Sequence, residues 1–428
     1  MLEDSIRKWN PWWADIEELQ QLTGESRTVI ENISETITIP HFKDVIGIRR
    51  SGKTTTLYQI IELLINDKIE PKNIIFLNFD DPDIQVTSFD ELIKTIDKIN
   101  LDISHVFLDE IQQKKEWEGW LRTLYDTKKF DQIFISGSSA SLLTRDVGRV
   151  LSGRHVTFVI YPFSFFEYLK FIGWKKFSKD YLEHNKNKLL HHIKSFLECG
   201  GFPEILDKSE YQRKIILTNV YNDILARDIT ARYNASFEIA QKISYHLLSN
   251  IGNEFSYRSV ANATNLSVET VEKYIEYLKE SFLIFTLNVF SYKTKVQFKQ
   301  NKKVYSIDTG LRNAVSFKIS EDIGRTVENM VFIELKRRNK DVYYWKNGKV
   351  EIDFVVKEGL KPTECIQVCW DISNERTKKR EKEGLITGLK TFKLDHGFII
   401  TEDYANEELV DNKKIIYVPI WKWLLSYQ

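Results

Sequence analysis

The sequence has few of the residues that build disulfide-bonded or disordered proteins. Its 428 residues include 3 cysteines, 8 prolines and 18 glycines. Cys199, Cys365 and Cys369 are too few for a disulfide framework, and they fit a four-ligand zinc site poorly, so we expect a reducing cytoplasm. No long tract is rich in proline, glycine or polar residues, and the chain is therefore expected to fold almost throughout.

Long apolar runs are also missing. No stretch reaches about 18 uncharged apolar residues, and the segment from Met1 to Trp13 contains no apolar signal core. These absences predict a protein that does not cross a membrane and is not secreted.

An excess of charge of either sign is absent too. Lysine and arginine number 61, aspartate and glutamate also number 61, and the formal net charge is +0. Without a global positive field, any contact with nucleic acid has to come from a local basic patch. The length of the chain predicts roughly two to four domains.

Short apolar segments alternate with helical ones in the first third of the chain. A helical entry segment over residues 1–35 precedes them. Strands are expected at 44–47, 73–78, 105–108 and 132–136. Apolar strands separated by helices indicate a parallel sheet that is covered on both faces.

A phosphate-binding loop follows the first of these strands. Gly47, four further residues, Gly52, Lys53 and Thr54 have the spacing of a P-loop, with a strand before it and a helix after it. The glycines let backbone amides point at phosphate oxygens, which the helix N-terminus also attracts. The residues predicted to bind ATP or ADP are Gly47, Arg50, Ser51, Gly52, Lys53, Thr54 and Thr55.

Two acids supply the remaining chemistry of a Mg²⁺–ATP site. Lys53 is expected to reach the β- and γ-phosphates and Thr54 to bind Mg²⁺. The apolar strand 106–108 ends in Asp109 and Glu110. We expect Asp109 to hold the metal through water and Glu110 to polarise the attacking water. The alternative is a strand followed by two solvated acids.

Small polar residues end the next strand at the same edge of the sheet, where ligands of open α/β sheets bind. Ser138 or Ser139 is therefore predicted to sense the γ-phosphate, with a helix N-cap as the alternative. Arg145, Arg149 and Arg154 follow. We favour Arg154 as the residue that stabilises transition-state charge, within the chain or across the subunits of a homo-oligomer, over a surface salt bridge.

In this order, the motifs resemble those of the archaeal-type AAA+ ATPases of prokaryotes, and the resemblance covers nearly the whole chain. It rests on the loop from Gly47 to Thr54, the acids Asp109 and Glu110, and the segments 10–13, 78–82, 151–154, 200–204 and 324–329. Members of this family join an ATPase core to a winged helix and a C-terminal domain with a restriction-endonuclease-like fold.

The predicted fold is α/β, with a P-loop NTPase sheet followed by further modules. A mostly helical stretch beyond residue 161 is predicted to form a lid. Three helices within 240–282 and a strand pair at 282–292 and 297–307 indicate a winged helix. The predicted domains are an ATPase core (1–155), a helical lid (156–235), a winged helix (236–312) and an endonuclease-like α/β domain (313–428).

The endonuclease-like domain departs from the pattern of an active enzyme. Such a site needs an acid, and then an acid and a lysine on the next strand, to hold a metal and assist the attacking water. This chain offers Asp353, but has Gln367 and Cys369 at the other two positions. Glu334 could approach Asp353, yet a degenerate and inactive nuclease fold is expected.

One basic patch could contact DNA. The recognition helix of the winged helix, 268–280, carries four glutamates and would repel phosphates. The patch lies in the predicted wing, and its lysines are Lys293, Lys295, Lys299, Lys302 and Lys303. Aromatic residues interleave them, as in nucleic-acid-binding segments, although a solvated hairpin would look the same.

The function predicted from the sequence is Mg²⁺-dependent ATP hydrolysis that controls what the C-terminal modules bind. A second hypothesis is a nucleotide-gated switch that binds an unknown protein and hydrolyses little ATP. A third is an ATP-regulated nuclease that uses Asp353 and Glu334. The sequence identifies neither the DNA nor the protein partner.

Overall fold

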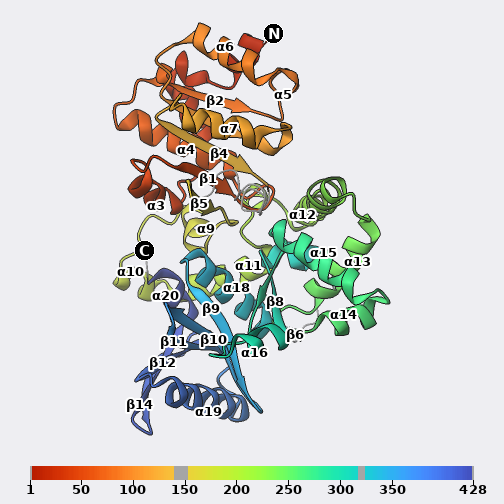
Figure 1. The fold of residues 1–428 in the computed structure, drawn as a ribbon. Coiled ribbons are helices and arrows are strands. Elements are labelled where there is room, and N and C mark those ends of the chain that lie inside the picture. The colour runs from red at the N-terminus through yellow and green to blue at the C-terminus, as the bar shows by residue number, and fades with distance from the viewer. Residues whose placement is uncertain (1, 139–152, 317–322, 427–428) are drawn as a thin grey trace. The chain divides into compact units, whose positions relative to one another are not determined.

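The computed structural model describes residues 2–138, 153–316 and 323–426, shown in Figure 1. The chain divides into two compact units, Met1–Tyr161 and Pro162–Gln428. Within the described ranges, no helix combines the length and apolar character needed to cross a bilayer.

The first unit is built on a parallel five-stranded sheet in the order β2-β3-β4-β1-β5. The strands are β1 (Phe42–Ile46), β2 (Ile74–Asn78), β3 (His105–Asp109), β4 (Gln132–Gly137) and β5 (His155–Val159). All residues of β1, β2 and β3 are buried. The prediction of a parallel α/β sheet is confirmed.

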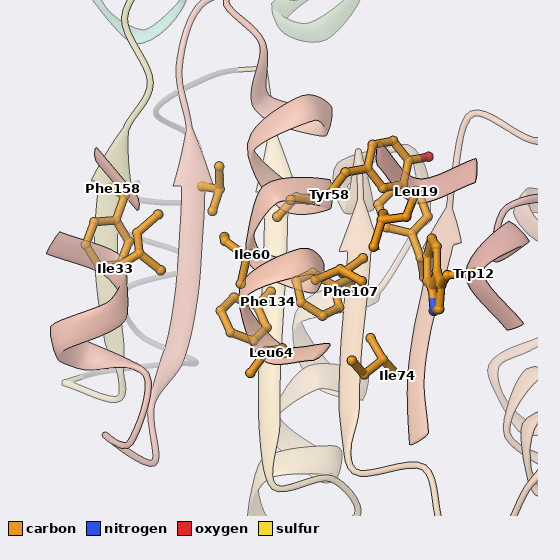
Figure 2. Close-up of a cluster of buried hydrophobic side chains, with 14 of the residues drawn as sticks. Trp12, Leu19, Ile33, Tyr58, Ile60, Leu64, Ile74, Phe107, Phe134 and Phe158 are labelled. Carbon is orange, nitrogen blue, oxygen red and sulfur yellow. The ribbon is translucent and has the colours of Figure 1, made fainter. Parts of the chain in front are cut away.

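Helices surround this sheet. They are α1 (Leu2–Lys8), α2 (Ile16–Thr23), α3 (Val29–Thr36), α4 (Lys53–Asn66), α5 (Pro82–Val86), α6 (Phe89–Ile99) and α7 (Trp117–Asp126), with short 3₁₀ turns at Pro11–Trp13, Pro71–Asn73 and Ile111–Gln113. Figure 2 shows the core between α4 and the sheet, where Tyr58, Ile60 and Leu64 lie beside strand residues. The rings of Phe107 and Phe134 stack there with centroids 4.4 Å apart.

The N-terminal segment covers the edge of β2 that is not paired with another strand of the sheet. The side-chain amide of Asn10 donates to the carbonyl of Phe76 (2.8 Å), and its oxygen accepts from the Phe76 amide (2.7 Å). Trp13 Nε1 donates to the carbonyl of Ile74 (2.8 Å). Asn10 and its neighbours thus pair with backbone groups that an edge strand would otherwise leave open.

The second unit begins with helices and continues with two sheets. Its helices are α9 (Phe165–Phe171), α10 (Lys179–His184), α11 (Lys186–Cys199), α12 (Glu210–Asp223), α13 (Phe237–Ser249), α14 (Tyr257–Thr264), α15 (Val268–Glu280), α16 (Thr294–Lys299), α17 (Thr309–Val315), α18 (Ile323–Arg337), α19 (Glu375–Phe392) and α20 (Ile420–Leu425). A 3₁₀ turn spans Pro203–Ile205, and α12 continues into a π-helical stretch, Ile224–Ala231.

The turn at Gly200 and Gly201 packs against two other segments of this unit. The amide of Gly201 donates to Asp308 Oδ2 (2.7 Å), and the carbonyl of Gly201 accepts from the Phe163 amide (2.7 Å). A Cβ atom on Gly201 would lie 2.3 Å from the Phe163 carbonyl oxygen. Glycine is needed here because the backbones approach so closely.

The smaller sheet is antiparallel and has the order β6-β8-β7, with β6 (Glu254–Phe255), β7 (Ile284–Leu287) and β8 (Lys302–Ser306). Strand β6 lies between α13 and α14, whereas β7 and β8 follow α15. The prediction of a long strand over 297–307 was wrong in its first half, where α16 lies instead. Strand β7 ends at Leu287, which pairs with Lys303, so the residues before Lys302 have no pairing position on β7. Within the connection between β7 and β8, Gln297 Nε2 donates a hydrogen bond to the carbonyl of Ser291 (2.6 Å).

The larger sheet has six strands in the order β13-β14-β12-β11-β10-β9 and mixes parallel and antiparallel pairs. Its strands are β9 (Asp341–Asn347), β10 (Val350–Glu358), β11 (Lys361–Val368), β12 (His396–Thr401), β13 (Asn406–Val410) and β14 (Lys413–Pro419). Helix α19 packs on it through Leu385 and Leu389. The predicted C-terminal helices and strands do form a sheet of their own, although the edge strand β13 was not predicted.

Candidate nucleotide site

The loop between β1 and α4 has the backbone of a tight phosphate-binding turn. Gly47, Arg50 and Gly52 have positive φ angles of 151°, 65° and 98°. A Cβ atom on Gly47 would lie 2.2 Å from the carbonyl oxygen of Ile160. Glycine is required at this position because β5 approaches the loop too closely for any side chain.

Arg27 was not predicted as a site residue, but it binds the backbone of this loop. Its buried guanidinium donates to the carbonyls of Ser51 (2.8 Å) and Tyr161 (2.6 Å). The backbone amide of Arg27 donates to Gln59 Oε1 on α4 (3.1 Å). The loop is therefore held to the following helix and to the end of its own unit. No local motif marks an arginine 20 or so residues before a P-loop.

Lys53 and Thr54 begin helix α4 and face the acids at the end of β3. Thr54 Oγ1 donates to Asp109 Oδ2 (2.9 Å). Lys53 Nζ donates to the carbonyl of Ile48 (3.2 Å) and lies 3.9 Å from Glu110 Oε1. The side chain of Lys53 is only 5% exposed. Four of the predicted site residues thus lie together at the carboxyl edge of the sheet.

Ser136 on β4 joins this group, although the sequence analysis assigned a role to its neighbours instead. Its hydroxyl donates to Asp109 Oδ1 and accepts from the backbone amide of Glu110 (3.1 Å). Glu110 has a left-handed backbone (φ 53°), and its carboxylate accepts from Gln112 Nε2. Asp109 and Glu110 are consecutive, yet each has its own set of partners.

The two acids also differ in their charge behaviour. Burial, and then the charge of Glu110, raises the pKa of Asp109 to about 6. In the folded protein Asp109 therefore binds a proton at a higher pH than it does in the unfolded chain. Its contribution to stability is favourable at low pH and is lost as pH rises through about 6.

Asp109→Asn is expected to stabilise the nucleotide-free protein at pH 7.5, by on the order of 2 kcal/mol, because the buried charge is removed. At pH 5 the gain should shrink, since the wild-type carboxyl is then protonated. Urea unfolding at both pH values measures the difference. The exposed Asp102, replaced in Asp102→Asn, serves as the matched control. An equal gain at both pH values would contradict the prediction.

Of the serines and arginines predicted for this site, Ser138 lies at the same edge of the sheet as the two acids, and the others lie elsewhere or outside the described residues. Ser138 is buried directly after β4, whereas Ser139, Arg145 and Arg149 fall in the undescribed range 139–152. Arg154 precedes β5, next to the start of β1, and its guanidinium pairs with Asp126 (2.8 Å). The phosphate loop follows the opposite end of β1. Within its own subunit, Arg154 is therefore not brought to Lys53 and Glu110.

In the second unit, only some of the lysines in the predicted patch are exposed on the surface. Lys293, Lys295 and Lys299 are exposed, and Lys302 donates to Tyr257 Oη (3.0 Å). Assigning Lys303 to the patch was wrong. It is 3% exposed, since strand β8 directs its side chain into ion pairs with carboxylates of α18 and β10.

The acids predicted for the endonuclease-like domain do not pair as expected. Glu334 binds Arg337 (3.3 Å) at the end of its own helix and Arg338 (2.9 Å) directly after it. The acid of α18 that shares a partner with Asp353 is instead Glu328, six residues earlier on the helix. Both bind Lys303, and the described residues contain no group of three or more His, Cys, Asp or Glu that could hold a metal ion.

Gln367 and Cys369 have structural partners. Gln367 Oε1 accepts from the Asp353 amide (2.7 Å), and its Nε2 donates to Glu381 (2.5 Å). Burial, and then the nearby Glu381, raises the pKa of Cys369 to about 12, so this thiol stays protonated at neutral pH. Neither side chain supplies the charge of the residue expected in an active nuclease.

Comparison with known proteins agrees with an AAA-type first unit. A family described as "AAA domain" matches residues 41–169. Two families described as domains of unknown function, DUF8612 and DUF4143, match residues 190–322 and 323–423. The first unit is accordingly a P-loop ATPase-like domain.

Whole-length relatives occur in archaea and bacteria. The uncharacterized protein MJ1544 of Methanocaldococcus jannaschii is 37% identical over 93% of this chain and 92% of its own length. An uncharacterized protein of Haemophilus influenzae is 29% identical over 89% of this chain and 93% of its own. Among solved structures, the Saccharomyces cerevisiae Hsp104–casein complex overlaps 62% of this chain and 51% of its own, with 13% identity and a TM-score of 0.31, too little to carry an argument.

Proposed function

The chain belongs to the family of archaeal and bacterial proteins that includes MJ1544 of Methanocaldococcus jannaschii, and we propose that it binds ATP with Mg²⁺ and hydrolyses it. The observation that carries the proposal is the 2.9 Å hydrogen bond between Thr54 Oγ1 and Asp109 Oδ2. It joins the phosphate loop to an acid on a different strand, at the place where a P-loop protein holds its metal.

The residues present fit this ligand pair. Ser51 Oγ is buried and has no hydrogen-bond partner among the described residues. The nearly buried Lys53 contacts the carbonyl of Ile48 and the carboxylate of Glu110. Backbone amides of Ser51 to Thr54 lead into the helix N-terminus, which favours an anion. Hydroxyl and carboxylate oxygens, as on Thr54 and Asp109, are ligands that Mg²⁺ prefers.

Each side chain then has one task. Lys53 binds the β- and γ-phosphates, with Gly47, Arg50 and Thr55 shaping the loop around them. Thr54 and Asp109 hold Mg²⁺, which when bound neutralises charge on the phosphates. Glu110, 3.9 Å from Lys53, orients a water molecule and accepts its proton as that water attacks the γ-phosphate. Ser136 fixes Asp109, and Ser138 contacts the γ-phosphate.

Arg154 fits this scheme as a residue that acts across subunits. Its place near the start of β1 and its ion pair with Asp126 leave it at the far edge of its own sheet. We therefore propose that it stabilises transition-state charge only in a homo-oligomer, at the site of a neighbouring copy.

The test is phosphate release by the purified, nucleotide-free protein at saturating ATP, with Mg²⁺ and with EDTA. We expect turnover that requires Mg²⁺. Bound nucleotide without any turnover, alone or at concentrations that favour oligomers, would favour the rival nucleotide-gated switch. Failure to bind ATP or ADP would reject both.

For the second unit we propose a winged helix over 236–312 and an endonuclease-like domain over 313–428 that has no nuclease activity. Helices α13 to α15, together with the antiparallel sheet formed by β6, β7 and β8, support the first assignment. DNA is the candidate partner of the exposed Lys293, Lys295 and Lys299, beside the 72% exposed Tyr292. The ion pairs of Asp353 with Lys303 support the absence of cleavage.

A further inference from the structure

Three carboxylates of the second unit converge on the ammonium group of Lys303. Its Nζ lies 3.0 Å from Glu328 on α18 and 2.6 Å and 3.4 Å from Glu351 and Asp353 on β10. Residues 351 and 353 are two positions apart on the strand, so their side chains point to the same face and both reach Lys303. The lysine itself comes from β8, in the smaller sheet, so one cation joins elements of both sheets.

The surroundings hold this arrangement in place. Tyr305 Oη, two residues along β8, donates to Glu328 Oε1 (2.6 Å). Asp353 Oδ2 accepts from the amide of Val368 on β11 (2.9 Å), leaving Oδ1 for Lys303. Next to Glu328, the side-chain amide of Asn329 pairs with both backbone groups of Ser306 on β8 (2.7 and 2.9 Å). Strand β8 and helix α18 are therefore fastened at adjacent positions.

The charges are unequal. One ammonium faces three carboxylates, and the lysine side chain is only 4% exposed. Burial opposes the charge on Lys303, but the acids Glu328, Asp353 and Glu351 raise its pKa well above the usual range, so it stays charged. Burial, and then the charge of Glu328, raises the pKa of Asp353 to about 7. The cluster is short of positive charge at neutral pH.

Three carboxylates around one point are also the ligands that a hard divalent cation prefers. Around Lys303 they stand 2.6 to 3.4 Å from the nitrogen, whereas metal–oxygen bonds to such cations are about 2.0–2.6 Å. A metal could therefore bind only after the ammonium has left and the acids have moved inward by up to roughly 1 Å. As placed, the cluster is not a metal site.

We propose that Lys303 is a built-in cation that occupies the centre of the Glu328–Glu351–Asp353 cluster and excludes divalent metal from it. The ammonium and a divalent cation are mutually exclusive occupants. Strand β8 thus keeps the C-terminal domain metal-free, and removing the lysine charge uncovers a divalent cation site. This inference does not depend on ATP hydrolysis.

The test titrates Mn²⁺ into nucleotide-free, full-length protein and follows the bound ion by electron paramagnetic resonance. All proteins carry Asp109→Asn, so that the acid beside the phosphate loop does not contribute. We expect Lys303→Ala to bind one Mn²⁺ per chain at least tenfold more tightly than the parent. Lys303→Arg, which keeps a cation, should behave as the parent does, and Lys303→Ala/Asp353→Asn should lose the gained site.

A folded Lys303→Ala that binds no more Mn²⁺ than the parent would overturn the proposal. So would a parent that already binds Mn²⁺ in a manner abolished by Asp353→Asn. Lys303→Met keeps much of the packing volume and covers the case in which the alanine variant does not fold. If Mn²⁺ restores the fold of either variant, the proposal is supported. If neither folds with or without Mn²⁺, the metal cannot replace the ammonium and the proposal fails.

Discussion

Glu110→Gln is expected to slow ATP hydrolysis by roughly 10²–10⁴-fold, the usual contribution of a general base, while ATP still binds. Glutamine keeps the shape of the side chain and its contact with Gln112, but it cannot accept a proton. The carboxylate of Glu110 is 14% exposed and lies 3.9 Å from Lys53, whereas Asp109 is already committed to Thr54 and Ser136. Phosphate release under single-turnover conditions measures the loss.

The matched control for this variant is Glu116→Gln, which makes the same change at an exposed position a few residues further along. It should hydrolyse ATP at the wild-type rate. Equal turnover by Glu110→Gln and the wild type would remove Glu110 from the chemistry.

The parts of the site that could be predicted from sequence are those whose residues are close together in the chain. The loop from Gly47 to Thr54 is read directly from its spacing, and Asp109 with Glu110 from the apolar strand before them. Their contact across 55 positions follows from the parallel sheet, because the ends of its strands meet at one edge. Topology alone therefore brought Thr54 and Asp109 together.

Contacts between side chains that are far apart in the chain could not be predicted, because they depend on the direction in which each side chain points. Ser136 was passed over for Ser138, since nothing local indicates which serine at the end of β4 faces Asp109. Arg27 reaches the loop through tertiary packing alone. Strand β5 was missed because its His-Val-Thr-Phe-Val sequence is only partly buried and lies just after an unpatterned segment.

The burial of the charged residue Lys303 could not be predicted from the sequence either. In sequence it is one of five lysines and looks solvated. In the structure it belongs to the buried part of β8, from Lys303 to Ser306, while Lys302 at the start of the strand stays half exposed. Glu328 and Glu334 sit six residues apart on α18, and sequence gave no means of telling which faces Asp353. The direction of each depends on how α18 packs against β8, a contact that joins residues about 25 positions apart in the chain.

Lys53→Ala is expected to weaken ATP binding by roughly 10²–10⁴-fold. The side chain is the buried cation at the start of α4, and its charge-assisted hydrogen bonds to two phosphates are worth about 1.5–3 kcal/mol each, with about 1.4 kcal/mol per tenfold in affinity. Calorimetric titration of the nucleotide-free protein with ATP measures the change. Turnover should fall at least in proportion, because Lys53 also faces the charge that develops on the γ-phosphate.

Thermal unfolding of Lys53→Ala distinguishes a lost contact with ATP from a loss of the folded structure. Removing Lys53 leaves Glu110 without its nearby cation, but that acid remains bonded to Gln112, so the variant should unfold near the wild-type temperature. Lys94→Ala, at an exposed position of α6, removes one lysine without touching the loop and should bind ATP as the wild type does. Wild-type ATP affinity in a folded Lys53→Ala would mean that the loop amides bind the phosphates unaided.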